Sequence, residues 1–269
     1  MMNDGMLGFL GAGKMAEALM SGAIRGGVVE ARNVLACDIV AARREDLAAR
    51  LGVGTTGDPM EVAARCRRIV LAVKPQDLGA LLAKVAPVLT REHLVFSIAA
   101  GKRLEWLQGI AAEARFVRVM PNLALMVGEG MCAYCPGALA TEEDAAEAER
   151  LLGCSGRVAR LPESCFDAVT ALSGSGPAFF AKVMVDLAAA AEADGLPADA
   201  ARLLAMQTML GTARYLIETR QDPAEFIRAV SSPKGTTVAG LDVMNGSDIG
   251  AVLGETIHAA ARRSRELSL

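Results

Sequence analysis

The sequence predicts an α/β fold in two parts, a doubly wound parallel sheet followed by an all-helical domain. In residues 1–161, short apolar runs alternate with helical patterns, which is typical of strands buried on both faces of a parallel sheet. In residues 162–269, strand patterns stop and every further segment has a helical pattern. We therefore expect two domains that meet at residues 161 and 162.

The hydrophobic pattern of each segment predicts the individual elements. The predicted strands are Met6–Leu10, Val34–Cys37, Arg68–Val73, Leu94–Ile98, Phe116–Val119, Met131–Cys135 and Arg157–Leu161. Helical patterns between them include Met15–Arg25, Ala41–Leu51 and Gln76–Val85. The predicted helices of the second domain are Ser164–Ala171, Pro177–Asp194, Ala198–Thr219, Ala224–Ala229, Thr236–Met244 and Ile249–Leu267. The helix Pro177–Asp194 is apolar on most sides, which indicates that a partner subunit covers it.

The composition argues against several classes of protein. The chain has 269 residues, of which 52% are hydrophobic, and a formal net charge of −3. Without a cluster of Lys and Arg, nucleic acid is not expected as a partner. No run reaches the ~18 uncharged apolar residues of a membrane span, and the first residues lack the basic start of a signal peptide. We therefore expect a cytoplasmic protein, with no membrane partner and with reduced cysteines.

Two of the six cysteines, Cys132 and Cys135, form a C-x-x-C pattern. No second pair lies at the spacing of a zinc ribbon. Residues i and i+3 of a strand point to opposite faces, so these two thiols are poorly placed to share a ligand. We interpret them as small buried side chains and predict no metal site.

A glycine-rich loop follows the first predicted strand. Residues 11–16 have the pattern G-x-G-x-x-A and directly precede a helix. The first glycine permits a tight turn, the second lets the backbone approach a pyrophosphate, and the alanine lets the helix pack on the strand. The helix start then presents free N–H groups to the phosphates. This context predicts a Rossmann-type site for NADPH or NADH, and a tight turn without a ligand is the alternative.

The second predicted strand ends at an acidic residue, Asp38, which lies 22 residues after Ala16. An acid at this place accepts hydrogen bonds from the adenosine ribose and repels a 2′-phosphate, which favours NADH. Arg43 and Arg44 follow closely and could reach a phosphate, or they could form the solvated face of a helix. The sequence leaves the choice between NADH and NADPH open.

Two further strand ends contribute to the predicted site, because ligands of such sheets bind beyond the carboxyl ends of the strands. Small residues after the fourth strand would let a nicotinamide ring lie against the backbone. Lys74, after the third strand, is either a cation near the cofactor or a surface charge. The predicted cofactor-binding residues are Gly11, Gly13, Lys14, Met15, Asp38, Ala72, Val73, Lys74, Pro75, Ala99, Ala100 and Gly101.

Two hydroxyl-rich segments open helices in the second half of the chain. Residues 173–176 precede Pro177, and this pattern predicts a helix cap and a tight turn. Residues 232–237 read Ser-Pro-Lys-Gly-Thr-Thr and offer hydroxyls, free N–H groups and the positive end of a helix. Plain capping needs one hydroxyl, so the second segment predicts a site for a carboxylate.

These motifs together resemble the pyrroline-5-carboxylate reductase family along nearly the whole chain. The matching segments are residues 8–16, 72–76, 118–122, 171–178 and 230–237. The pairing of S-G-S-G-P-A with S-S-P-x-G-T-T is the specific part of the resemblance. The resemblance implies hydride transfer from NADPH or NADH to the C=N bond of a cyclic imino acid, 1-pyrroline-5-carboxylate. It also implies a homodimer or a ring of dimers with interlocked helical dimerisation domains.

The resemblance further implies roles for single residues. The substrate carboxylate would lie at the 232–237 segment, with the imine nitrogen near Thr237 as the catalytic residue. A cyclic imine can be protonated near neutral pH, so no strong protein acid is demanded, and positioning and charge complementarity could supply most of the rate. Neither His93 nor His258 is then expected to act as a base. The implied substrate-binding residues are Ser175, Ser232, Lys234, Gly235, Thr236 and Thr237.

The chain also departs from the family's pattern, and two alternatives follow. Lys234 stands where the family usually has glycine, Leu123 and Ala124 replace a Thr-Pro pair, and Pro59 replaces an asparagine that often contacts the cofactor. One alternative is a β-hydroxyacid dehydrogenase that uses Lys182 on the long helix, although the Lys182 and Asp186 spacing fits a simple salt bridge. The other is a non-catalytic, nucleotide-sensing regulator with the same fold.

Overall fold

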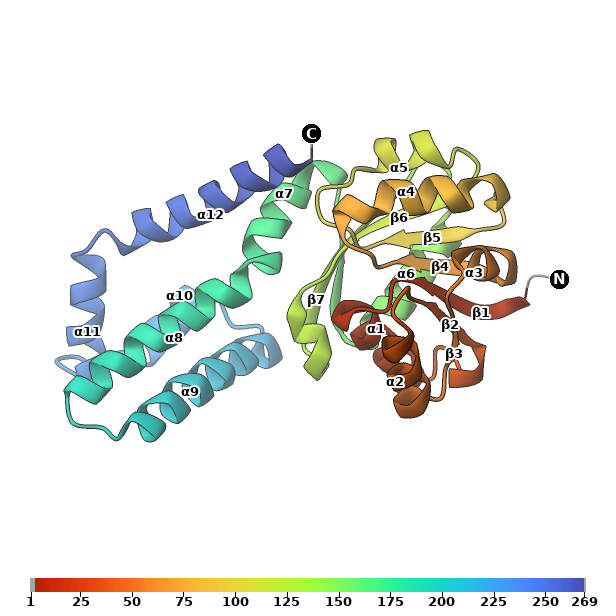
Figure 1. Cartoon of the computed structure of the whole chain (residues 1–269). Helices are drawn as coiled ribbons and strands as arrows, with labels where there is room; N and C mark the ends of the chain where they lie inside the picture. Colours follow the sequence, from red (N-terminus) through yellow and green to blue (C-terminus); the bar gives the residue numbers. More distant parts are fainter. Residues whose placement is uncertain (1–2, 269) are drawn as a thin grey trace. The chain divides into compact units, whose positions relative to one another are not determined.

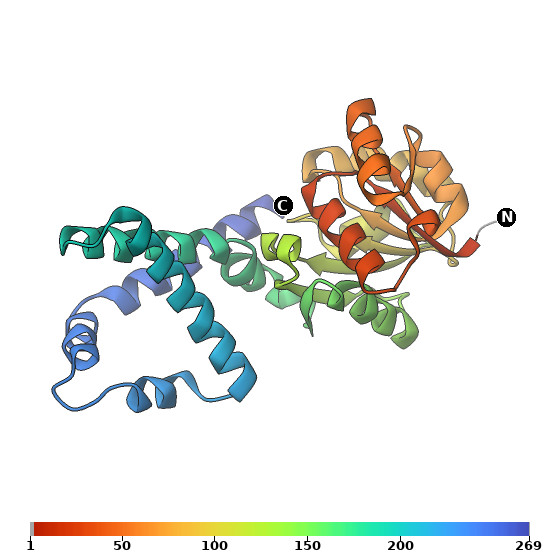
Figure 2. The same cartoon turned by 90° about the horizontal axis from the view of Figure 1, so that it is seen from below.

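The computed structural model describes residues 3–268, with side chains from residue 5 onward. The described chain forms two compact units, one of residues up to Ser175 together with Ala260 onward, and one of residues 176–259. Figures 1 and 2 show the elements of each unit. The domain boundary expected at residues 161 and 162 stays a prediction.

The first unit contains an eight-stranded sheet in the order β3-β2-β1-β4-β5-β6-β7-β8. All neighbouring strands are parallel except β6 and β7, which are antiparallel. The strand order reverses beside β1, and this reversal makes the sheet doubly wound. The predicted fold class is therefore confirmed. The strands are β1 (Asn3–Leu10), β2 (Val34–Cys37), β3 (Gly54–Thr56), β4 (Cys66–Leu71), β5 (Leu94–Ser97), β6 (Arg115–Met120), β7 (Gly130–Pro136) and β8 (Gly156–Arg160).

Helices cover both faces of this sheet, and each face has its own core (Figure 1). Phe9 belongs to the core beneath α1, α2 and α6, together with Leu19 and Leu47. Leu10 belongs to the core beneath α3, α4 and α5. Successive side chains of a strand point to opposite faces, so β1 contributes to both cores. The helices are α1 (Lys14–Arg25), α2 (Ala41–Leu51), α3 (Pro59–Arg65), α4 (Pro75–Val85), α5 (Leu104–Ile110) and α6 (Glu142–Gly153).

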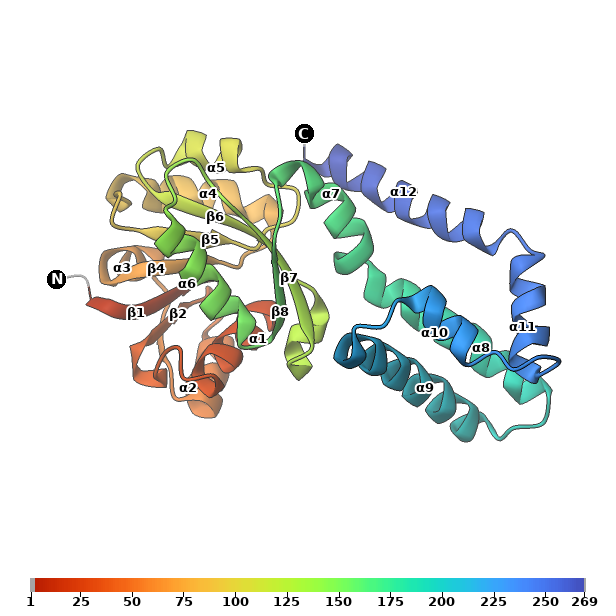
Figure 3. The ribbon, with the colours of Figure 1, turned by 180° about the vertical axis from the view of Figure 1, so that it is seen from behind.

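The second unit is helical, as predicted. Its long helices α8 and α9 pack side by side (Figure 3). Gly195, with a φ of 102°, forms the turn that separates them. The helices are α8 (Gly176–Ala193), α9 (Ala198–Thr219), α10 (Pro223–Ala229), α11 (Thr236–Asn245) and α12 (Ile249–Leu267), which ends in the first unit.

The segment before α8 belongs to the first unit and contains a short α7 (Phe166–Val169) and a π-helix, η5 (Thr170–Gly174). Within the described residues, one helical stretch, 163–193, passes the length and hydropathy test for a membrane span. Only 11% of its most apolar window is buried within this chain. Helices that other protein segments cover have the same composition, so one such stretch is weak evidence for a membrane.

Candidate active site

The glycine-rich loop joins β1 to α1, and its two glycines serve different purposes. Gly11 has a φ of 99°, and a Cβ there would lie 2.7–2.8 Å from backbone atoms of Ala72 and Val73. Gly13 faces open space and begins α1 without a side-chain cap. The fold itself therefore requires Gly11, whereas Gly13 leaves the approach to the helix start clear. This open helix start fits a pyrophosphate, which backbone N–H groups would hold.

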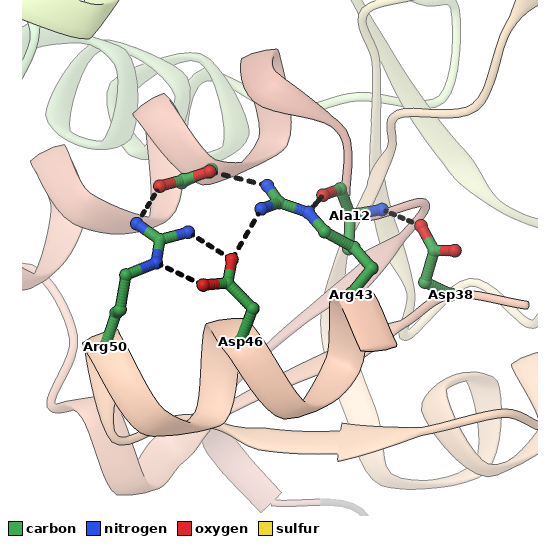
Figure 4. Close-up of polar contacts among 6 residues, drawn as sticks. Ala12, Asp38, Arg43, Asp46 and Arg50 are labelled. Carbon is green, nitrogen blue, oxygen red and sulfur yellow. Dashed lines mark hydrogen bonds and ion pairs between the residues drawn. The ribbon is translucent and has the colours of Figure 1, made fainter. Parts of the chain in front are cut away.

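Asp38 lies at the carboxyl end of β2 and fixes the loop beside it (Figure 4). Its Oδ2 accepts a hydrogen bond from the Ala12 N–H at 3.0 Å, and its Oδ1 accepts one from the Val40 N–H at 2.9 Å. The guanidinium of Arg44 donates to the backbone carbonyl of Asp38 at 2.8 Å. Both carboxylate oxygens thus accept a backbone hydrogen bond.

Arg43 connects α2 to the same loop (Figure 4). Its Nε donates to the Ala12 carbonyl at 2.7 Å, and its terminal nitrogens pair with Glu17 at 2.5 Å and with Asp46 at 3.0 Å. Arg50 also donates to Glu17, whose side chain is 14% exposed. The hydrogen bond from Arg50, with help from Arg43, holds the pKa of Glu17 below its ordinary value. Arg43 is therefore part of a connected network, rather than a solvated helix residue.

The ends of β4 and β5 complete this edge of the sheet. Lys74 is exposed and precedes α4, where Pro75 occupies the first turn. Residues 99–101 follow β5, and Gly101 has a φ of 75°. A Cβ at Gly101 would lie 2.9 Å from the carbonyl oxygen of Leu267, at the end of α12. Because β1, β2, β4 and β5 are adjacent parallel strands, all predicted cofactor-binding residues lie along one edge.

The predicted substrate segment, residues 232–237, forms a turn that opens α11. The Gly235 N–H donates to the Ser232 carbonyl at 2.9 Å, and Lys234 adopts the left-handed conformation with a φ of 60°. Gly235 begins α11 without a side-chain hydrogen bond. Thr236 and Thr237 are exposed. The segment therefore presents hydroxyls and open helix N–H groups to a ligand, as a carboxylate site requires.

The other predicted substrate residue, Ser175, follows the π-helix η5. A Cβ at Gly174 would lie 2.5 Å from the terminal methyl of Met120, at the end of β6. The side-chain amide of Asn122 donates to the Ser173 hydroxyl at 3.5 Å. Sequence reasoning did not find this link between β6 and η5, because the two segments are 51 residues apart. π-helical turns often occur at functional sites, and the Ser175 N–H closes this one by donating to the Thr170 carbonyl at 2.8 Å.

Several other candidates have structural roles. His93 is buried, its Nδ1 accepts from the Thr90 N–H at 2.9 Å, and its Nε2 lies 3.0 Å from the Ala63 carbonyl. Both ring nitrogens are therefore engaged, which leaves neither for a substrate. Lys182 pairs with Asp186 at 2.5 Å on an exposed face of α8. The prediction of a simple helix salt bridge is confirmed.

The cysteines are free thiols, all of which lie in the described part of the chain. Burial raises the pKa of Cys132 to about 12, so this thiol stays protonated and unreactive near neutral pH. Within residues 3–268, no group of three or more His, Cys, Asp or Glu side chains could hold a metal ion.

A doubly wound sheet with this loop, and a carboxylate at the end of β2, defines a dinucleotide-binding protein of the Rossmann type. Comparisons with known proteins narrow this class. Residues 163–267 match the family model for pyrroline-5-carboxylate reductase dimerisation, and residues 6–101 match the model for coenzyme F420-dependent NADP oxidoreductase. A pyrroline-5-carboxylate reductase of Methanosarcina acetivorans is 40% identical over 267 residues, which is 99% of each chain. The chain belongs to the pyrroline-5-carboxylate reductase family.

Solved structures agree with this assignment. A pyrroline-5-carboxylate reductase of Coxiella burnetii has a TM-score of 0.95 and 30% identity, over 99% of this chain and 100% of that one. A pyrroline carboxylate reductase of Plasmodium falciparum, solved with NADP bound, has a TM-score of 0.87 and 26% identity over all of both chains. The recognition of the family from its motifs is therefore confirmed.

Proposed function

We propose that this protein is a pyrroline-5-carboxylate reductase, which transfers a hydride from NAD(P)H to the C=N bond of 1-pyrroline-5-carboxylate. The product is proline, and the reaction is the last step of proline biosynthesis. The observation that carries the proposal is the 40% identity to a reductase of this name over 99% of both chains.

We propose that the edge formed by β1, β2, β4 and β5 holds the dinucleotide, which supplies the hydride. The start of α1, with Gly13, Lys14 and Met15, would hold the pyrophosphate, because its N–H groups have no side-chain cap. Asp38 would bind the adenosine ribose. The backbone at residues 99–101 would support the nicotinamide, since small side chains leave the ring room to lie flat.

We propose that residues 232–237 hold the substrate carboxylate. Their helix start carries a partial positive charge, and Lys234 adds a full one. Thr237 would position the imine nitrogen through its hydroxyl. The imine is protonated near neutral pH, so the site needs alignment and charge complementarity rather than a strong acid. The engagement of both His93 nitrogens is consistent with this mechanism.

The match to the family's dimerisation domain, residues 163–267, includes the whole second unit, and we propose a homodimer or a ring of dimers. A hollow of about 560 Å³ along α8 and α9 is lined largely by apolar side chains, including Leu187, Leu204 and Leu216. Such apolar surface is typical of a protein interface. We infer that a second copy of the chain, rather than a membrane, covers the apolar residues of 163–193. We also propose that the enzyme is cytoplasmic and does not bind nucleic acid.

The substitution Thr237→Ala tests the proposed mechanism. We expect kcat for pyrroline-5-carboxylate to fall at least about tenfold, because the imine loses its positioning hydroxyl. The affinity for NADH or NADPH should stay unchanged in a direct titration. Thr256→Ala is the matched control, since the Thr256 hydroxyl donates only within α12, to Val252. Normal turnover by Thr237→Ala would contradict the assigned role.

The two alternatives predict different results in the same assay. A nucleotide-sensing regulator would bind the dinucleotide and reduce no cyclic imine. A β-hydroxyacid dehydrogenase would oxidise hydroxyacids and lose that activity on Lys182→Ala. The exposed Lys182–Asp186 pair gives no support to the β-hydroxyacid dehydrogenase alternative, because the Asp186 carboxylate already binds the Lys182 ammonium.

A further inference from the structure

We infer that the adenosine end of this site selects NADH over NADPH. A carboxylate fixed at the end of β2 would exclude the 2′-phosphate, and Arg43 on α2 is engaged elsewhere. This inference rests on the proposed use of a nicotinamide dinucleotide. It goes beyond family membership, since the Plasmodium falciparum relative was solved with NADP bound.

The first observation is that Asp38 is held in place. Its two oxygens accept the backbone N–H groups of Ala12 and Val40, at 3.0 and 2.9 Å. Ala12 is fully buried, so rotation of the carboxylate would leave a buried N–H without an acceptor. Asp38 therefore cannot turn away to admit a phosphate at low cost. A fixed carboxylate here accepts hydrogen bonds from ribose hydroxyls and repels a phosphate at the 2′ position.

The second observation concerns the residues that follow Asp38. Residues 39–42 are Ile-Val-Ala-Ala and carry no charge. Ile39 is 92% exposed and Val40 is 53% exposed, at the start of α2. Cationic and hydroxyl side chains are the usual partners of a 2′-phosphate, and residues 39–42 offer neither. Exposed apolar side chains suit contact with an adenine ring, which both cofactors share.

The third observation is that all three nitrogens of the Arg43 guanidinium already donate to a partner (Figure 4). Its donors are used by the Ala12 carbonyl, by Glu17 and by Asp46. Moving Arg43 to a phosphate would leave the Ala12 carbonyl without this donor and Glu17 with Arg50 as its remaining cation. Because Glu17 and Asp46 bind the guanidinium of Arg43, this side chain is not free to bind a phosphate.

Two other cations lie nearby, and neither provides a ready 2′-phosphate site. Arg44 donates to the backbone carbonyl of Asp38 at 2.8 Å, so it supports the loop that holds the carboxylate. Lys14 opens α1, where the pyrophosphate is expected. Both cofactors have the same pyrophosphate, so an interaction there cannot distinguish between them.

The test compares two cofactor fragments that differ only in the 2′-phosphate, ADP-ribose and 2′-phospho-ADP-ribose. Isothermal titration of the full chain measures their dissociation constants without any imine. We expect ADP-ribose to bind at least tenfold more tightly. Equal affinities, or tighter binding of the phosphorylated fragment, would overturn the inference. This measurement needs no variant, so it does not depend on whether a substitution folds.

Variants then assign the selectivity to residues. Asp38→Asn should reduce the ratio of the two dissociation constants at least about fivefold, because the amide carries no charge. Glu45→Gln removes one negative charge from the exposed surface of α2 and should leave the ratio unchanged. An unchanged ratio in Asp38→Asn, or an equal effect in Glu45→Gln, would refute the role of Asp38.

A double variant tests the part assigned to Arg43. Adding Glu17→Gln to Asp38→Asn releases one partner of Arg43, so the affinity for 2′-phospho-ADP-ribose should rise further. No rise would refute this part of the inference. Steady-state kinetics with pyrroline-5-carboxylate should also give a kcat/KM at least tenfold higher with NADH than with NADPH. If neither cofactor reduced the imine, the proposed function would fail while the binding ratio still tested the selectivity.

Discussion

The two compact units of this chain differ in how completely they bury their own side chains. In the first unit, Phe9 and Leu10 pack into cores on opposite faces of the sheet, and both are at most 1% exposed. Within residues 176–259, all of which are described, the buried apolar side chains are Ala188 and Ala201. Leu203 and Leu204 in the same unit are more than half exposed. The first unit therefore has its own buried core, whereas the exposed apolar surface of the second is typical of a protein interface.

Gly11→Ala should have the largest effect on stability, because the new side chain would clash with the backbone of the first unit. A φ of 99° strains any side chain, and the new Cβ would lie 2.7–2.8 Å from backbone that cannot move easily. We expect a loss of about 3 kcal/mol or more in the free energy of unfolding. Urea unfolding, followed by circular dichroism, measures this loss.

Gly13→Ala is the matched control, since its Cβ would enter open space. We expect the free energy of unfolding to change by at most about 1 kcal/mol. Binding of ADP-ribose should nevertheless weaken at least about tenfold, because the methyl group would obstruct the approach to the helix start. Equal destabilisation by the two substitutions would contradict the separate purposes assigned to these glycines.

Leu204→Glu should have the next largest effect, because it places a charge in the apolar hollow of the second unit. Each buried leucine contributes about 2 kcal/mol to an interface, and an unpaired buried charge costs more. We expect the oligomer to dissociate, as measured by analytical ultracentrifugation. Ile39→Glu changes an even more exposed apolar residue of the first unit and should leave the molecular mass unchanged.

The sequence predicted most of the sheet because its strands are apolar runs with a clear boundary. It did not reveal β3, Gly54–Thr56, which is three residues long and has no buried residue. It also did not show that β7 runs antiparallel to β6. Strand direction depends on which segments pair in space, and no local pattern records that choice.

The local geometry of the candidate site was predictable where a short motif sets the backbone, as at Gly11 and Asp38, whose roles toward a ligand stay predictions. The contacts of Arg43 could not be predicted, because the sequence of α2 does not show whether this helix position faces solvent or faces Glu17 on α1. Arg43 and Glu17 are 26 residues apart in the chain. At position 234 the sequence left two effects of the lysine open, a charge or a lost conformation, and the structure shows that Lys234 adopts the left-handed conformation itself.

Lys234→Gly, in the second unit, tests separately whether Lys234 strains the backbone and whether its charge contributes to substrate binding. A left-handed residue other than glycine costs about 1 kcal/mol, so the variant should be more stable by about that amount. Its KM for the imine should rise severalfold, because the site loses a positive charge. Arg220→Gly, at the other non-glycine residue of residues 176–259 with a positive φ, should stabilise similarly and leave KM unchanged. An unchanged KM in Lys234→Gly would show that the lysine does not contact the substrate carboxylate.

Glu17→Gln should have the smallest effect, and it tests whether the first unit's charge network contributes to its stability. Arg50 and Arg43 lower the pKa of Glu17 from its ordinary value of 4.5. A carboxyl group whose pKa is lower in the folded state stabilises the fold above its unfolded pKa, and this contribution disappears as the pH falls through the folded pKa. At pH 7 the variant should therefore be less stable by up to about 1 kcal/mol. The difference should shrink as the pH falls from 4.5, where the unfolded chain begins to take up the proton, through the lower pKa of the folded state. Urea midpoints at pH 7 and pH 3 measure this convergence, while Glu45→Gln should follow the wild type at both values. A difference as large at pH 3 as at pH 7 would mean that Glu17 acts through packing rather than through its charge.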